Sequence, residues 1–335
     1  MHDFGVSLCH CIILDLPMSL DPNNLLQGLP IIHFDVMSPS RFGVFPRRHP
    51  EKIRWFETEA CFIFHTASTW DEESITIEGK KEICAVNMLA CRYTSGNMLH
   101  SMGGIDLKST PGTVKNDGND SLLYYYRFEL LEDKNVITHQ WALSAIPFEM
   151  PILPRPNSMG EPEYIYGCSS QDSMFGSVTG EPMKINCLVK MNVKKLINRG
   201  LLDSLDSING CVDERNIQEI HESTDPNDPI TVFTAPPGWY VQEPRFVPRS
   251  NAIWEDDGYI MTFMFDESQL NEKGKAPATA KSELWIIDAR NMENIVAKIL
   301  LPQRVPYGFH GNWFSRNEIE EQRPFKTSRN EQWEL

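Results

Sequence analysis

The sequence predicts an all-β protein, and three observations lead to this fold class. Short strand-like runs recur along the chain, and few segments have helical periodicity. Twenty-three prolines and 20 glycines interrupt the chain too often for long helices. The segment "YIMTFMFDE" (259–267) alternates as a strand does, with successive side chains on opposite faces. Many short strands separated by turn residues favour a sandwich, a barrel or a propeller.

Thirteen runs have the length and composition of strands, and turn-forming clusters separate them. In chain order these are Val6–Leu14, Ile31–Val36, Ile53–Glu57, Ala60–Thr66, Ile83–Tyr93, Leu122–Leu131, Val136–Ser144, Tyr164–Cys168, Lys184–Met191, Ile230–Thr234, Tyr259–Phe265, Glu283–Asp288 and Ile295–Leu300. The last two form the clearest predicted hairpin, with a polar turn around Asp288–Asn294, as is common in propeller blades.

One region breaks the β pattern. The segment "NVKKLINRGLLDSLDSI" (192–208) carries apolar residues at helical spacing, and "DERNIQEIHES" (213–223) indicates a second short helix. We therefore expect a short helical excursion near 192–224. The sequence contains no strong internal repeat that would indicate a WD40-type array.

Charge and cysteine content exclude several classes. The 335-residue chain has a net charge of −15, whereas nucleic-acid binding needs a basic face. Its eight cysteines form no CxxC pair, and no secretory leader is present, so we expect a reducing, cytoplasmic location. No apolar run approaches the roughly 20 residues of a transmembrane helix.

Cys9 and Cys11 flank His10, which raises the possibility of a metal site. Residues i and i+2 also share one face of a strand, so "SLCHCIILDL" fits a buried strand equally well. The strand is the favoured interpretation.

Two histidines and two glutamates stand in apolar surroundings. His65 interrupts "ACFIFHTAS", and His310 lies between two glycines in "VPYGFHGNW". The simplest interpretation is that a neighbouring carbonyl satisfies each imidazole. Glu149 in "AIPFEMPILP" and Glu243 in "WYVQEPRFVPR" could each accept the free N–H of a metal-bound imidazole. Alternatively, each forms an ordinary salt bridge, for example between Glu243 and Arg245 or Arg249.

Five segments of the chain carry motifs that recur in a fixed order. The segments are "MHDFGVSLCHCIILDLPMSLDP" (1–22), "WFETEACFIFHTASTWDE" (55–72), "IPFEMPILPRPN" (146–157), "QEPRFVPRSNAIWEDDGYIMTFMFDE" (242–267) and "LPQRVPYGFHGNWF" (301–314). In this order they resemble the motifs of the carotenoid cleavage oxygenase family: the first carries a His-Asp-Phe triplet, and the second is similar to a Phe-His-x-x-Asn-Ala-Trp-Glu ligand segment. In residue choice, the segments resemble fungal members similar to lignostilbene dioxygenases.

The resemblance implies a seven-bladed β-propeller with one Fe(II) on its axis, held by four histidines. By motif, His2, His65 and His310 correspond to three of these ligands, and Glu149 and Glu243 to carboxylates that accept from ligand imidazoles. No further catalytic residue is expected beyond the ligands. Neutral imidazoles suit Fe(II), and carboxylates fix their tautomers.

The chain also departs from the family pattern. The family's first ligand histidine lies upstream of the His-Asp-Phe segment, at which this chain starts. We therefore expect residues 1–335 to form one partial propeller domain of C-terminal blades, lacking the N-terminal blades and the fourth ligand, with a polar tail over 315–335. In addition, Ser68-Thr69 replaces Asn-Ala, and Asp71 stands where Glu is usual.

The function implied by the resemblance is an Fe(II)-dependent dioxygenase that uses O₂ to split a conjugated C=C bond into two carbonyls. Its substrate would be a stilbene or an apocarotenoid, between which the sequence does not choose, and truncation would impair the activity. Membrane contact is a feature of carotenoid-cleaving relatives, but no apolar patch for it is evident. The alternative hypothesis is a catalytically inactive propeller remnant, with a binding role or no independent role.

Overall fold

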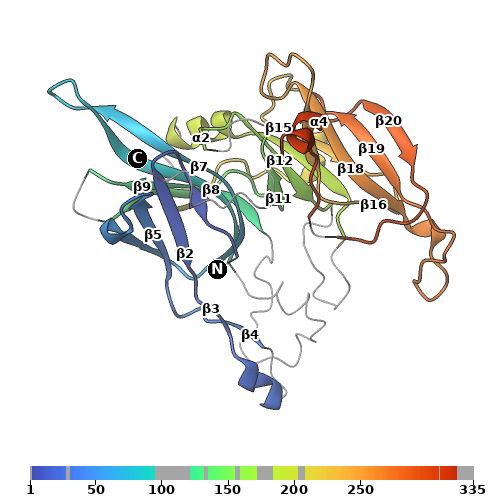
Figure 1. Ribbon diagram of the computed structural model, residues 1–335, viewed down its shortest axis with the longest axis horizontal. Helices are drawn as coiled ribbons and strands as arrows, with labels where there is room; N and C mark the ends of the chain where they lie inside the picture. The colour runs from blue at the N-terminus through green and yellow to red at the C-terminus, as the bar shows by residue number, and fades with distance from the viewer. Residues whose placement is uncertain are drawn as a thin grey trace.

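The computed structural model describes residues 2–27, 31–94, 121–131, 135–154, 159–171, 184–202, 208–308 and 310–322. Its strands form four sheets of four or five strands and one two-stranded ribbon, and the sheets follow one another across the molecule (Figure 1). The prediction of a mostly β protein is thus confirmed, whereas closure into seven blades stays a prediction.

The first sheet has the order β1-β2-β5-β6, and the second has the order β14-β10-β9-β8-β7. The strands of the first sheet are β1 (Gly5–Val6), β2 (His10–Asp15), β5 (Ser40–Pro46) and β6 (Arg54–Thr58). Those of the second are β7 (Phe62–Ile75), β8 (Lys81–Tyr93), β9 (Leu122–Glu129), β10 (Ile137–Ala142) and β14 (Ile208–Cys211). The ribbon of β3 (Met18–Leu20) and β4 (Ile32–Phe34) extends away from the body (Figure 1).

The third sheet has the order β11-β12-β13-β15, and the fourth has the order β16-β18-β19-β20 with β17 also paired to β18. The third contains β11 (Glu149–Ile152), β12 (Tyr164–Ser169), β13 (Cys187–Asn192) and β15 (Ile230–Thr234). The fourth contains β16 (Trp239–Val241), β17 (Arg245–Pro248), β18 (Gly258–Asp266), β19 (Glu283–Asp288) and β20 (Ile295–Leu300). The predicted hairpin is confirmed, since β19 and β20 pair antiparallel.

The predicted helical excursion is also present. It contains α2 (Val193–Leu202) and α3 (Ile217–His221), with β14 between them as a parallel partner of β10. The other helical segments among the described residues are the short α4 (Arg316–Glu320), at the start of the expected polar tail, and the 3-10 turns η1 (Pro22–Gln27), η2 (Pro50–Lys52) and η4 (Glu267–Gln269). Residues 323–335 of that tail lie outside the described residues. Among the helices that the structure describes, none is long and apolar enough to cross a membrane.

The prediction of one continuous strand over Val6–Leu14 is wrong. The chain reverses between β1 and β2, which pair antiparallel, and the Ser7 amide donates to the His10 carbonyl across the turn. The side chain of Ser7 accepts from the His10 amide, so the short turn satisfies its own backbone groups. Apolar composition alone did not reveal this reversal.

Most central strands are buried on both faces, and this organises the core. Along β9, Leu123 and Tyr125 belong to the core between the second and third sheets, while Tyr124 and Tyr126 belong to the core between the first and second. On β13, Leu188 belongs to a further core between the third and fourth sheets. Alternation thus sends neighbouring side chains of one strand into different cores, which explains the continuous apolar run "LLYYY" (122–126).

Helix α2 packs on the second sheet at a point where only glycine fits. A Cβ at Gly200 would lie 2.9 Å from three atoms of the buried Trp141 indole. We expect Gly200→Ala to lower the free energy of unfolding by roughly 1–3 kcal/mol through overpacking, although alanine is the better helix former.

Urea unfolding followed by circular dichroism measures this change. Asn198→Ala is the matched control, because Asn198 is exposed on the same helix and its replacement leaves the packing intact. Equal stability of G200A and N198A would contradict the close packing of α2 on Trp141.

Candidate functional site

Three imidazoles from distant parts of the chain lie side by side. The ring centroids of His2 and His65 are 5.2 Å apart, and those of His65 and His310 are 5.1 Å apart. Both pairs are nearly perpendicular, with interplanar angles of 82° and 86°. His65 belongs to β7, whereas His2 precedes β1 and His310 follows β20. The structure therefore brings together the three histidines singled out by their motifs.

Each of these imidazoles has its Nδ1 atom held by an oxygen. His65 Nδ1 lies 2.6 Å from Glu149 Oε2, and His310 Nδ1 lies 3.1 Å from Glu243 Oε1. These two histidines thus pair with carboxylates, so the interpretation that carbonyls satisfy them is wrong. His2 does have a carbonyl partner, since its Nδ1 lies 2.8 Å from the Phe64 oxygen. Donation from Nδ1 leaves Nε2 of each ring as the basic atom.

The surroundings of His65 are the most restrictive. Its side chain is 19% exposed and that of Glu149 is 4% exposed. The Met150 amide also donates to Glu149 Oε2, over 2.7 Å, which fixes the carboxylate. Nε2 of His65 is buried and has no hydrogen-bond partner among the residues that the structure describes. A buried basic nitrogen without a partner is costly, so this atom is suited to binding a ligand or an ion.

Burial would lower the pKa of His65, but the hydrogen bond and the charge of Glu149 outweigh it and raise this pKa above its usual value. Asp3 and Glu243 add smaller contributions in the same direction. The site thus combines basic imidazoles with nearby negative charge, which favours a cation.

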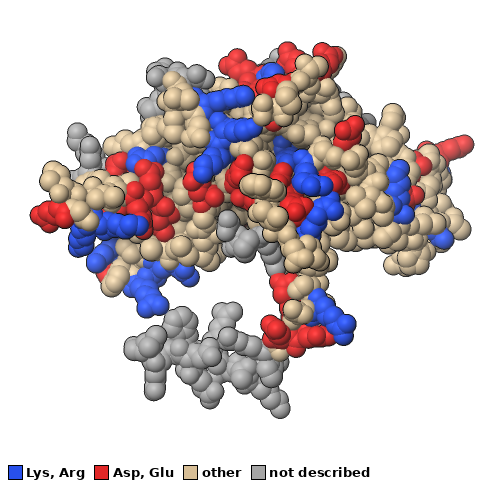
Figure 2. All heavy atoms as spheres, turned by 90° about the horizontal axis from the view of Figure 1, so that it is seen from above, with Lys and Arg blue, Asp and Glu red and all other residues tan. Residues whose placement is uncertain are grey.

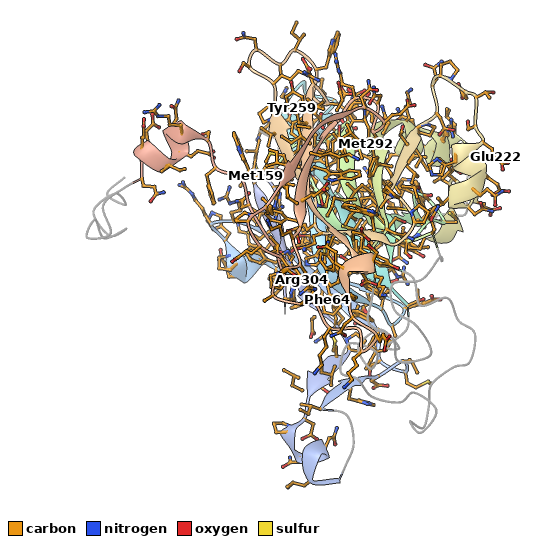
Figure 3. All side chains as sticks on the ribbon, turned by 90° about the vertical axis from the view of Figure 1, so that its right-hand side faces the viewer. Phe64, Met159, Glu222, Tyr259, Met292 and Arg304 are labelled. Atoms are coloured by element: carbon orange, nitrogen blue, oxygen red, sulfur yellow. The ribbon has the colours of Figure 1, made fainter. Side chains whose placement is uncertain are left out.

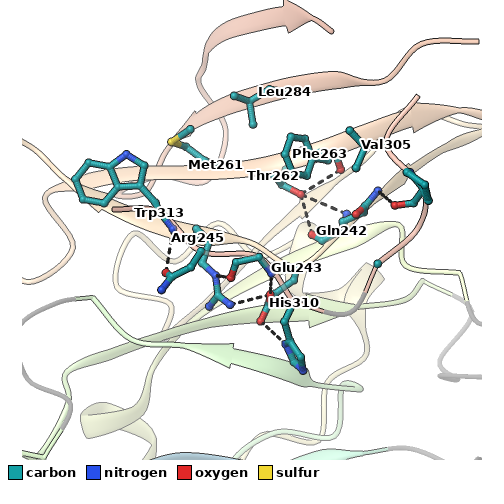
Figure 4. A pocket seen from close by; sticks show the side chains of 14 residues that line it. Gln242, Glu243, Arg245, Met261, Thr262, Phe263, Leu284, Val305, His310 and Trp313 are labelled. Carbon is teal, nitrogen blue, oxygen red and sulfur yellow. Dashed lines mark hydrogen bonds and ion pairs between the residues drawn. The ribbon is translucent and has the colours of Figure 1, made fainter. Parts of the chain in front are cut away.

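His310 lies at a more open end of the site, with its side chain 49% exposed. Its partner Glu243 is nearly buried and accepts two further hydrogen bonds at Oε2, from the Gly311 amide over 2.9 Å and from Arg245 Nη2 over 2.8 Å (Figure 4). The expected ion pair with Arg245 therefore coexists with the histidine contact. Arg249 instead pairs with Asp257 and Asp288.

A cavity of about 250 Å³ adjoins His310 against the fourth sheet (Figure 4). Its wall is largely apolar, with polar groups near the histidine. The apolar side chains include Met261, Phe263, Leu284, Val305 and Trp313. Phe64, next to His65, lies toward the end of the molecule from which the ribbon extends (Figure 3).

The histidines form an open group. Within the ranges described above, no three His, Cys, Asp or Glu side chains are grouped closely enough, in their present arrangement, to hold a metal ion. His10 does not join them, because its Nδ1 lies 2.7 Å from Asp71 Oδ1 and the side chain is buried on β2. The strand interpretation of the Cys9–Cys11 segment holds only in part, because His10 and Cys11 lie on β2 whereas Cys9 is exposed in the turn before it. Asp71 also accepts from Ser7 and from the Cys9 amide, so it anchors the first turn.

Sequence reasoning missed several supporting groups. The Phe64 carbonyl is a backbone atom and carries no sequence signal. Asp3 was visible only as a member of the His-Asp-Phe triplet, yet its carboxylate accepts from both the amide and the hydroxyl of Thr66, beside His65. Arg245 was considered only as an alternative partner of Glu243.

Elsewhere, acidic and basic side chains are interspersed over the face in Figure 2.

The pairing of His65 with Glu149 can be tested without a metal. Glu149→Gln removes the negative charge while the burial remains, so we expect the pKa of His65 to fall. Imidazole ¹⁵N chemical shifts, followed against pH in chelator-treated protein, measure it. Glu243→Gln is the matched control and should lower this pKa less, because Glu243 bonds His310 instead. Equal pKa values of His65 in E149Q and wild type would contradict the assigned pairing.

Comparison with known proteins gives a consistent result. The model of the retinal pigment epithelial membrane protein (RPE65) family matches residues 1–315. The carotenoid dioxygenase carX of Gibberella fujikuroi is 46% identical over 370 residues, covering 98% of this chain and 52% of that protein. Carotenoid 9,10(9',10')-cleavage dioxygenase 1 of Arabidopsis thaliana is 30% identical, covering 96% of this chain and 50% of that protein. The chain therefore spans about half the length of these relatives.

Solved structures share the fold. The lignostilbene dioxygenase of Pseudomonas brassicacearum superposes with a TM-score of 0.66 at 19% identity, covering 93% of this chain and 54% of that one. A mutant of the Synechocystis apocarotenoid oxygenase gives a TM-score of 0.63 at 17% identity, covering 93% and 52%.

Proposed function

We propose that this chain, which belongs to the RPE65 and carotenoid cleavage dioxygenase family, carries most of the site of a non-haem Fe(II)-dependent dioxygenase. The reaction would use O₂ to cleave a conjugated C=C bond of a hydrophobic substrate into two carbonyl products. One observation carries the proposal. Three adjoining imidazoles are held through Nδ1, and the buried Nε2 of His65 has no hydrogen-bond partner within the described part of the chain.

The residues fit an Fe(II) ion chemically. Neutral imidazoles are suitable ligands for this ion, and the Nδ1 contacts leave Nε2 available on each ring. An ion at Nε2 of His65 would also relieve the cost of burying that atom unpaired. When bound, Fe(II) would supply the redox chemistry with O₂, whereas the protein supplies position and charge.

The protein groups have distinct tasks in this proposal. Glu149 would hold His65 in one tautomer and orientation, and it is itself fixed by the Met150 amide. Glu243 would do the same for His310, with Arg245 restraining the carboxylate. The His310 side chain is half exposed, so this imidazole lies at the open side of the site.

For the substrate, we place a carotenoid-type polyene ahead of a stilbene. The sequence relatives at 46% and 30% identity are named carotenoid dioxygenases, whereas the lignostilbene enzyme resembles this chain in fold at 19% identity. The apolar wall beside His310 is compatible with either hydrophobic class.

Metal binding is the first test. We expect the purified chain to bind about one Fe(II) under anaerobic conditions, and His65→Ala to weaken binding by tenfold or more, because the central imidazole is lost. Elemental analysis after anaerobic titration and gel filtration measures both. His33→Ala is the control, since His33 is exposed on β4 and far in sequence from the cluster. Folded wild-type chain without iron would rule out the proposed cofactor.

Cleavage is the second test. We expect O₂-dependent aldehyde release from an apocarotenoid, with a lower kcat/KM for a resveratrol-like stilbene, measured by chromatography of the products. The H33A variant should retain the activity and H65A should lose it. Iron binding without product from either substrate would favour the alternative of an inactive propeller remnant.

A further inference from the structure

Strand β7 is irregular at the position of His65. Its pairing with β8 runs Ile63↔Arg92, Thr66↔Ala90 and Ser68↔Leu89, so five steps along β7 correspond to three along β8. Two extra residues are thus inserted into β7 around His65. Bulges of this kind bend a strand and re-aim its side chains, and they leave backbone groups to be satisfied elsewhere.

Asp3 satisfies the backbone at this bulge. Its Oδ2 atom accepts from the Thr66 amide and from the Thr66 hydroxyl, over 2.8 Å in each case. Its Oδ1 atom accepts from the Phe4 amide, also over 2.8 Å, which fixes the carboxylate to its own segment. One carboxylate therefore joins the segment before β1 to the bulge of β7.

A second hydrogen bond lies at Phe64, on the other side of His65 in the sequence from Thr66. His2 Nδ1 lies 2.8 Å from the carbonyl oxygen of Phe64, so residues 2 and 3 contact residues 64 and 66. The approach of the two segments is close, because a Cβ at Gly5 would lie 2.6 Å from the Thr69 hydroxyl oxygen. His2 and His65 are thus held across a tightly packed pair of segments, with Asp3 as the side-chain link.

We propose that Asp3 is a positioning residue for the metal centre, which sets the spacing of His2 and His65 by capping the bulge at Thr66. This inference rests on the proposed function. Without the carboxylate, the Thr66 amide loses its acceptor, and the segment that carries His2 loses its attachment beside His65.

The test compares Asp3→Ala and Asp3→Asn with wild type. Co(II) serves as the probe, because its visible spectrum reports ligand geometry without turnover. We expect D3A to weaken Co(II) binding by about tenfold or more and to change the spectrum, with a smaller effect for D3N, which keeps one acceptor oxygen. D3N also keeps the test available if D3A does not fold.

Asp35→Ala is the matched control. Asp35 likewise accepts from a backbone amide and a hydroxyl, those of Met37 and Ser38, but away from the histidines. It should leave Co(II) affinity and spectrum unchanged. If D3A and D3N match D35A in both, Asp3 does not position the metal centre and the inference is overturned.

A metal-free measurement separates this inference from the proposed function. In chelator-treated protein we expect D3A to speed hydrogen exchange of the Thr66 amide and to remove the nuclear Overhauser contact between the His2 and His65 rings. If wild type binds no metal, the proposed function fails. In that case loss of the ring contact in D3A still supports Asp3 as the spacer, and its retention overturns it.

Discussion

The packing of sheets against one another on both faces is the constraint on which the rest of the structure depends. Consecutive side chains of β9 and β13 enter different cores, so a sheet in the middle of the molecule is stable only between two neighbours. The same packing assembles the site. His2 precedes the first sheet, His65 lies on the second, Glu149 begins the third, and Glu243 lies between β16 and β17 of the fourth.

This origin explains why the three histidines lie far apart in the sequence, each in a motif of its own. The histidines and their carboxylate partners come from different sheets or from segments beside them. Only the packing of the sheets against one another brings these side chains to contact distance. The contacts then reinforce the packing, because His65–Glu149 joins the second and third sheets by a short hydrogen bond. His310 is joined to the fourth sheet through Glu243, which Gly311 and Arg245 also hold. The buried centre is therefore rigid at His65 and more open at His310.

Two aspartates, one on β7 and one before β1, connect the first sheet to strand β7 and so to this centre. Asp71, on β7, accepts from the turn at Ser7 and His10, and Asp3, before β1, accepts from Thr66 on β7. The two links are reciprocal, so the start of the chain is fixed to β7 before β1, through Asp3, and at the β1–β2 turn, through Asp71. The contacts of Asp71 lie at His10 and the turn, not at the three clustered histidines.

The sequence by itself determined the β class, the helical excursion and most strands, because these follow from alternation and turn residues that act locally. It missed strands such as β5, which contains a glycine and a proline, and the reversal at Ser7, which depends on one hydroxyl. Ordered motifs identified His2, His65 and His310 and their carboxylates by resemblance. Only the tertiary structure decided that these rings adjoin, that Phe64 offers a carbonyl and that Asp3 caps a bulge. Such contacts join residues more than 60 positions apart, and their geometry arises from inter-sheet packing, which no local pattern encodes.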